Sequence, residues 1–72
     1  MRTILADSMM KYLAGKVTYH KANVLVYLQS PVGIGEHPDI MAAIEEELAK
    51  CAEYHEKLEI LGEILMGAEL DG

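Results

Sequence analysis

The 72-residue chain has one cysteine, two prolines, no tryptophan and no phenylalanine. The single Cys51 excludes an internal disulfide and a zinc cage built from cysteines. Without these large aromatic residues, and with five methionines, the interior is expected to be aliphatic. A chain this short buries only about 60% of the surface of its unfolded form, so domains of this size commonly need partners, metals or disulfides. We therefore expect a single domain, residues 1–72, that needs a partner.

Basic residues are also few, six against twelve acidic ones, and the formal net charge is −6. This balance argues against duplex nucleic acid, whose phosphates need cationic partners. The sequence shows no signal-peptide pattern and no apolar run of 18 residues, so we expect a cytoplasmic protein without membrane contact. The charge is uneven: residues 1–30 hold four basic residues and one acid, for +3, and residues 31–72 hold two basic residues and eleven acids, for −9.

Both prolines and two of the six glycines lie between Ser30 and Pro38. Proline removes a backbone donor and disfavours helix in the residue before it, and glycine adopts conformations that other residues avoid. This segment is therefore expected to be the turn of a hairpin. The expected first helix, loop, second helix and frayed tail cover about residues 2–29, 30–37, 38–66 and 67–72. A buried strand at 24–28 is the alternative, but no partner strand is evident.

Apolar residues recur at steps of three and four in both halves, which is the spacing of one helix face. The predicted stripe of the first helix is Met10, Leu13, Val17, Val24 and Leu28. The predicted stripe of the second helix is Ile44, Leu48, Cys51, Leu58 and Leu65, with His55 and Gly62 at the remaining steps. The second helix is expected to begin at Pro38 with His37 as its cap, and to end at Gly67. The predicted fold class is all-α, an antiparallel two-helix hairpin.

Many apolar residues fall outside these stripes, and one seam between two helices cannot cover them. They are Ile4, Leu5, Met9, Leu25 and Val26 in the first helix, and Ile40, Met41, Ile60, Leu61 and Ile64 in the second. Exposed apolar patches of this size usually mark an interface. We therefore expect the chain to bind itself and form a homo-oligomeric helical bundle, of which a dimeric four-helix bundle is the smallest form.

A polar, aromatic and basic stripe accompanies the apolar stripe of the first helix. Its candidate ligand-binding residues are Lys11, Tyr12, Lys16, Tyr19, His20 and Asn23. Lysine ammonium groups suit phosphates and tyrosine rings stack on bases, so the stripe suits a nucleotide-type ligand. The same residue types are common at protein interfaces and at the boundary of helical bundles, and these two interpretations stay open.

The loop holds further candidates. Gly33, Gly35 and His37 precede a helix, where backbone N–H groups can cradle an anion. The pattern is neither a dinucleotide fingerprint nor a P-loop, because no strand precedes it and the Gly-Lys-Ser/Thr ending is missing. A tight interhelical turn is the alternative interpretation.

No metal, cofactor or catalytic group is predicted. Cys51, His55 and Glu59 are spaced four residues apart and are types that zinc accepts, but one helix rarely presents three ligands to one ion. Packing in the core or seam is the preferred interpretation of Cys51. Neither Ser8 nor Ser30 lies in a nucleophile elbow. Acidic surroundings disfavour the thiolate of Cys51, so we expect a protein that is not an enzyme.

The run from Val26 to Ile40, Val-Tyr-Leu-Gln-Ser-Pro-Val-Gly-Ile-Gly-Glu-His-Pro-Asp-Ile, resembles a group of small uncharacterised accessory proteins of tailed bacteriophages. In that group a Val-Gly-Ile-Gly-Glu-His-Pro segment joins two helices. The stretch 52–60 is similar to the matching part of their second helix. The resemblance covers about residues 24–65 and implies a helical hairpin and a phage-type accessory protein in the host cytoplasm. Small acidic phage proteins of this kind often bind a host protein or sequester a nucleotide signal used in host defence.

These observations support two main hypotheses about function. The first is a homo-oligomer that sequesters a small anionic nucleotide-type ligand, with three lysines for its phosphates, two tyrosines for a base, and Asn23 for a base or ribose edge. The lysines are Lys11, Lys16 and Lys21, and the tyrosines are Tyr12 and Tyr19. The second is a protein–protein inhibitor or adaptor that binds a host protein through acids expected to face solvent, Glu45, Glu46, Glu47, Glu53 and Glu56. A purely structural assembly component is a third possibility.

Overall fold

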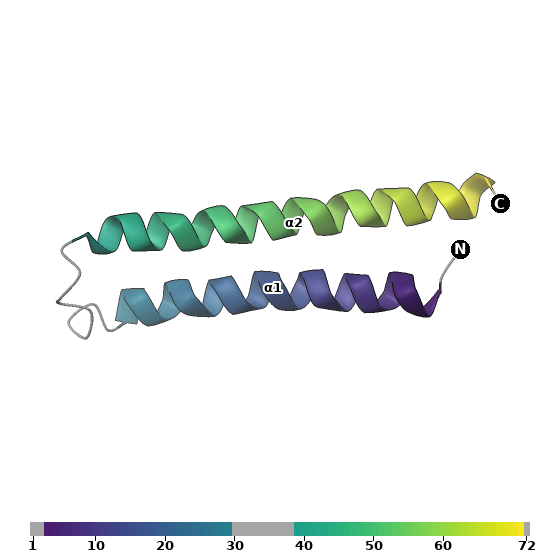
Figure 1. Cartoon of the computed structure of the whole chain (residues 1–72). Coiled ribbons are helices and arrows are strands. Elements are labelled where there is room, and N and C mark those ends of the chain that lie inside the picture. The colour runs from purple at the N-terminus through teal and green to yellow at the C-terminus, as the bar shows by residue number, and fades with distance from the viewer. Residues whose placement is uncertain (1–2, 30–38, 72) are drawn as a thin grey trace.

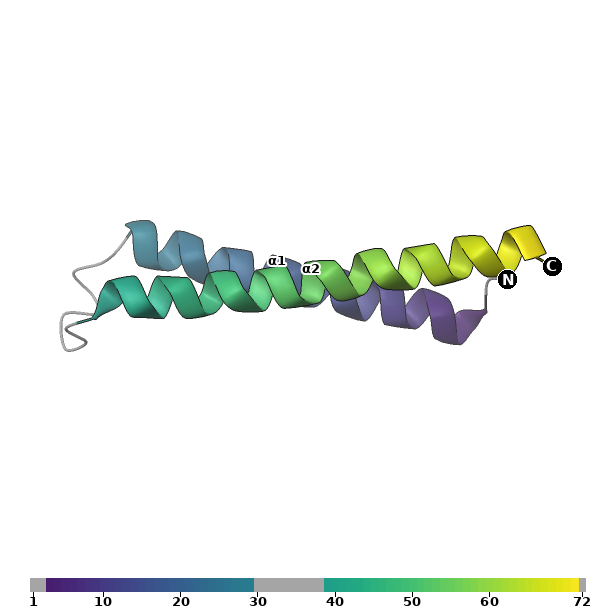
Figure 2. The same ribbon diagram turned by 90° about the horizontal axis from the view of Figure 1, so that it is seen from above.

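The structure is a computed structural model that describes residues 3–29 and 39–71, with side chains of the second range as far as residue 67. Two α-helices, α1 over Ile4–Gln29 and α2 over Ile40–Asp71, pack side by side and run antiparallel (Figure 1). Seen from above, they cross near their middle (Figure 2). The predicted all-α antiparallel hairpin is confirmed, and residues 24–28 are helical rather than a strand.

Each helix begins with a side-chain cap. The hydroxyl oxygen of Thr3 accepts a hydrogen bond from the backbone N–H of Ala6 at 3.1 Å. A carboxylate oxygen of Asp39 accepts one from the N–H of Ala42 at 2.9 Å. Each bond satisfies a donor that the first turn of a helix leaves free. Asp39 is therefore the cap of α2, and the predicted cap, His37, lies outside the described residues.

The second helix is longer than expected, because it continues through Gly67 to Asp71. Glycine costs about 1 kcal/mol relative to alanine inside a helix, but the leucine, methionine, alanine and glutamate around Gly67 are strong helix formers. A glycine that ends a helix usually adopts a positive φ, and no described glycine does so. The predicted end at Gly67 is therefore wrong.

The seam between the helices follows an alternating three-four repeat, the pattern of coiled coils. Its buried and half-buried positions in α1 are Ala6, Met10, Leu13, Val17, His20, Val24 and Tyr27. Its half-buried positions in α2 are Ile40, Ile44, Glu47, Cys51, Tyr54, Leu58, Leu61 and Leu65. We call these two sets the seam.

In α1 most of the predicted apolar stripe lies in the seam. Among the described residues, Leu13 and Val17 are the buried apolar side chains, and His20 is buried beside them. Leu28 is 60% exposed, so its predicted inward position is wrong, and Tyr27 occupies the seam instead. The apolar core of a single hairpin is therefore small.

In α2 the prediction fails at two positions. Leu48 is 52% exposed and His55 is also exposed, whereas Glu47 and Tyr54 lie in the seam. The polar side chains face α1 because His20 provides a hydrogen bond for Glu47 and a stacking surface for Tyr54. A polar contact between the helices therefore outweighs the burial of one leucine.

One hairpin leaves a large surface exposed. Its radius of gyration is 16.4 Å, against about 11 Å for a compact chain of this length. Its accessible area is 5554 Å², against roughly 4,450 Å² for a compact protein of the same mass. Neither helix, over the described residues, has an apolar stretch long enough to cross a membrane.

The small seam core gives a first prediction, which compares two valines of α1. Val17 is 9% exposed and Val26 is 59% exposed. Val17→Ala should lower the free energy of unfolding by about 2 kcal/mol, because it removes buried methyl groups and leaves a cavity. Val26→Ala should change it by less than about 0.5 kcal/mol. Urea titration followed by circular dichroism measures both, and equal losses would contradict the assignment of the seam.

Candidate functional site

The middle of the seam is polar. The Nδ1–H of His20 donates a hydrogen bond to Oε1 of Glu47 at 2.7 Å, and the amide of Asn23 donates to the same oxygen at 2.9 Å. The side chains of His20 and Glu47 are mostly buried. Among the described residues no buried side-chain polar atom lacks a hydrogen-bond partner. The network therefore joins α1 to α2 without an uncompensated polar group.

These hydrogen bonds favour the charged form of Glu47. The pKa of Glu47 lies below its ordinary value because His20, and then Asn23, donate hydrogen bonds to its carboxylate. Partial burial acts in the opposite direction, and the charges of His20 and Lys50 add to the lowering. Glu47 is therefore a carboxylate that the fold holds in its ionised form.

Two tyrosines and two lysines surround this network. The ring of Tyr54 stacks on His20 with centroids 5.8 Å apart, and Tyr19 meets His20 edge-on at 4.9 Å. The Nζ of Lys16 lies 5.4 Å from the ring centroids of both Tyr19 and Tyr54. The Nζ of Lys57 lies 4.8 Å from the centroid of Tyr54. We call Lys16, Tyr19, Tyr54 and Lys57 the lysine–tyrosine cluster.

The geometry of the cluster suits an anion that carries a flat ring. Two ammonium groups near one tyrosine ring repel each other, and an anion bound beside them would reduce that repulsion. Lys57 is already 3.5 Å from Glu53, an exposed ion pair of the kind that contributes little. Tyr19 is exposed although Lys16 lies over its ring, so the remaining ring surface is accessible for stacking. Charge and ring surface are thus both offered on one side of the hairpin.

Four residues predicted from α1 come together in this region: Lys16, Tyr19, His20 and Asn23. His20 is buried and bonded to Glu47, so it supports the cluster from within the seam rather than facing solvent. Tyr12 lies one helical turn before Lys16 and is exposed. Gly33, Gly35 and His37 lie outside the described residues, and their part of the site stays a prediction.

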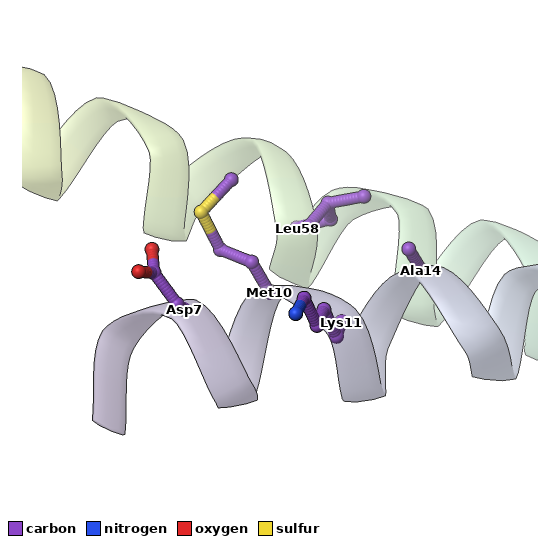
Figure 3. Close-up of a pocket in the computed structure, with 5 residues that line it drawn as sticks. All are labelled: Asp7, Met10, Lys11, Ala14 and Leu58. Atoms are coloured by element: carbon purple, nitrogen blue, oxygen red, sulfur yellow. The ribbon is translucent and has the colours of Figure 1, made fainter. Parts of the chain in front are cut away.

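Lys11 does not lie near the lysine–tyrosine cluster. It borders an open groove of about 530 Å³ whose lining residues are Asp7, Met10, Lys11, Ala14 and Leu58. Figure 3 shows Met10 reaching from α1 toward Leu58 of α2, with Lys11 and Ala14 beside it. Lys11 follows a seam residue, whereas Lys16 precedes one, so helical geometry places them on opposite sides of the seam. Within one hairpin the two lysines do not form a single pocket.

Sequence reasoning missed three residues of the site: Glu47, Tyr54 and Lys57. The available signal was the three-four repeat that begins at Ile40, because it places Glu47 and Tyr54 in the seam. Leu48 hid that signal, since a leucine beside a glutamate is the obvious choice for an inward position. The sequence marks Lys57 only by its spacing of four residues from Glu53, which predicts an exposed ion pair.

The three residues considered for zinc do not converge. Cys51 is half-buried in the seam, where its Sγ lies 3.9 Å from the carbonyl oxygen of Val17. His55 and Glu59 are exposed, with Nε2 and Oε2 3.6 Å apart. Within residues 3–29 and 39–71, no group of three or more potential ligands is arranged to hold a metal ion.

Comparison with known proteins gives no family for the chain. No family model, no curated protein and no solved structure matches it. The geometry of the cluster is therefore the basis on which a function can be proposed.

The lowered pKa of Glu47 gives a prediction about acid stability. A carboxyl group whose pKa is lower in the folded state stabilises the fold above its unfolded-state pKa, and this contribution is lost as the pH falls through the folded-state pKa. Wild-type protein should therefore lose more stability than Glu47→Gln between pH 7 and pH 3. Urea titrations across this range measure the difference. Glu56→Gln, at an exposed position of α2, is the control and should follow the wild type.

Proposed function

We propose that the protein binds a small anionic ligand of the nucleotide type and sequesters it, without converting it, as a homo-oligomer. The observation that carries this proposal is the position of two ammonium groups over one ring. Lys16 and Lys57 come from different helices, and both lie within 5.4 Å of the centroid of Tyr54. The chain has only six basic residues and a net charge of −6. The position of two of its lysines beside one ring therefore favours an anion-binding site.

The cluster offers the separate contacts that a nucleotide needs. Charge-assisted hydrogen bonds from Lys16 and Lys57 would hold a phosphate. The exposed ring of Tyr19 would stack on a base. Asn23, whose NH₂ is bonded to Glu47, would use its amide oxygen to accept from a base or ribose edge. Sequestration needs only such binding contacts and no activated nucleophile.

Self-association belongs to this proposal for two reasons. The cluster lies on the open side of a two-helix hairpin, and ligand sites usually bury most of their ligand. Further subunits of an oligomer can supply the missing walls. The hairpin also exposes large apolar side chains along both helices, which supports an oligomer. Gly33, Gly35 and His37 would complete the pocket from this chain or a neighbour.

The biological role proposed for the ligand follows from the resemblance to small phage proteins. An accessory protein without catalytic groups can still inhibit host defence by binding a signal and lowering its free concentration. We infer that the ligand is a nucleotide-type signal of host defence and that capture takes place in the host cytoplasm. Binding would need to be tight enough to compete with the host receptor of the same signal.

The proposed site is tested by isothermal titration with a panel of mono- and dinucleotides. At least one should bind, and Lys16→Ala and Lys57→Ala should each weaken that binding about tenfold or more, because each removes a charge-assisted contact worth about 1.5–3 kcal/mol. Lys11→Ala removes the same charge on the opposite side of the seam and should have an effect of less than about threefold. Equal losses in all three variants would show a general charge effect and contradict the site.

The acidic surface of α2 supports a second candidate function, an inhibitor or adaptor that binds a basic surface of a host protein. Its exposed acids are Glu45, Glu46, Glu53, Glu56, Glu59 and Glu63. Glu47 was predicted among them, but this prediction is wrong because Glu47 is bonded within the seam. A binding surface on α2 would therefore exclude it.

This alternative is tested by reversing two outward charges. Glu56→Lys combined with Glu63→Lys should abolish pull-down of a host partner, because complementary charges steer and orient such complexes. Nucleotide titration of the same double variant separates the two functions. Unchanged partner capture would contradict the role of the acidic surface.

A further inference from the structure

We propose that a second copy of the chain docks on the side of the hairpin opposite the lysine–tyrosine cluster, with the twofold axis of the dimer parallel to the helices. This inference rests on the self-association included in the proposed function and assigns a surface and a geometry to it. The surface, which we call the docking face, has four apolar and four charged members: Leu25, Leu28, Met41, Leu48, Lys11, Lys21, Glu45 and Glu59.

Helical spacing divides the hairpin into two sides. Residues one position before a seam residue lie on the side of the cluster, as the meeting of Lys16 and Lys57 over Tyr54 shows. Residues one position after a seam residue lie on the opposite side, as Lys11 and Ala14 do where they line the groove (Figure 3). Every member of the docking face directly follows a seam residue.

The apolar members gather at one end of this face. Leu25 and Leu28 lie in the last two turns of α1, and Met41 and Leu48 lie in the first three turns of α2. These segments are adjacent because the helices are antiparallel (Figure 1). Each of the four side chains is more than half exposed. Their apolar surface is therefore available to a partner.

The charged members make the face complementary to itself. Its lysines, Lys11 and Lys21, are on α1, and its glutamates, Glu45 and Glu59, are on α2. Asp7 lies on the same side one turn before Lys11, so α1 offers two positive charges and one negative charge, and α2 offers two negative charges. A twofold axis parallel to the helices places α1 of one copy on α2 of the other, so lysines meet glutamates. A twofold axis in the face and perpendicular to the helices would instead place α1 on α1, and lysines would meet lysines. The charges therefore select the first arrangement.

The lysines of α1 and the glutamates of α2 also lie at similar heights along the axis of the hairpin. With a rise of 1.5 Å per residue, Lys11 lies about 27 Å from the end of α1 and Glu59 about 28 Å from the start of α2. Lys21 and Glu45 lie at about 12 Å and 8 Å on the same scale. Rotation about an axis parallel to the helices preserves these levels. Each lysine would therefore meet a glutamate of the second copy, and the two apolar ends would meet each other.

The hairpin as a whole exposes enough area for an interface of standard size. The hairpin exposes 5554 Å², roughly 1,100 Å² more than a compact protein of its mass. A standard stable interface takes about 800 Å² from each partner. A dimer of this size would be a four-helix bundle in which every helix has antiparallel neighbours. The lysine–tyrosine cluster would stay on the outer side of that bundle, so the missing walls of the proposed ligand site would come from a further copy that associates when the ligand binds.

A charge-swap experiment tests the proposal. Sedimentation equilibrium of the full chain should show a dimer. Lys21→Glu alone and Glu45→Lys alone should each raise the dimer dissociation constant about tenfold or more, because each homodimer then contains two like-charge contacts. An equimolar mixture of the two variants should restore association to within about threefold of the wild type, since both contacts of the mixed dimer are again complementary. Glu56→Lys, outside the docking face, should leave the dimer unchanged.

An apolar pair of variants tests the choice of side. Leu28 is 60% exposed and Val26 is 59% exposed, but they lie on opposite sides of α1. Leu28→Ser should weaken the dimer and Val26→Ser should not. A monomeric wild type, a mixture that fails to associate, or equal effects of the two serine variants would each overturn the proposal. Nucleotide titration of the same samples reports on the Lys16 site independently, so failure of the docking face and failure of the proposed function remain separate results.

Discussion

The hydrogen bond between His20 and Glu47 sets the alignment of the two helices, and much of the structure depends on it. An apolar pair of similar volume would often be at least as stable in the seam, because burying charged groups is costly. A polar pair, however, is satisfied only when both partners lie at the same level. The bond, 2.7 Å long, therefore selects one alignment of α1 on α2, as a single buried polar residue does in coiled coils. The stacking of Tyr54 on His20 depends on the same alignment.

Much of the fold could be predicted from the sequence, because the two features that determine it can be recognised within short stretches of the chain. Proline and glycine are concentrated in one segment, and apolar residues recur with helical spacing on both sides of it. The inward face of α2 could not be predicted by the same reasoning, because hydrophobicity favours Leu48 over Glu47 and cannot anticipate a histidine on the other helix. The extension of α2 beyond Gly67 has a similar cause, since the neighbouring helix formers outweigh the cost of one glycine.

The candidate site, like the fold, could be predicted from the sequence only in part. Lys16, Tyr19, His20 and Asn23 follow one another along α1, so helical spacing alone predicts that they lie close together. Tyr54 and Lys57 come from α2 and reach them only through the alignment that the His20–Glu47 bond fixes. Lys11 illustrates the opposite error: it is near Lys16 in sequence, but a difference of one position relative to the seam places it on the other side of the hairpin. Two residues close in sequence on a helix can therefore be assigned to one site only when both lie on the same side of the seam.

The seam thus separates two surfaces with different chemistry. On one side the lysines of both helices converge on a tyrosine, which brings like charges together and suits an anionic ligand. On the other side the lysines lie on α1 and the glutamates on α2, which makes that surface complementary to a second copy of itself. The few basic residues of an acidic chain are therefore divided between a proposed ligand site and a proposed interface. Because both surfaces combine residues of α1 and α2, a change in the alignment of the helices would disturb both at once. The polar contact at His20 is thus placed where it can preserve both proposed surfaces, at the expense of a larger apolar core.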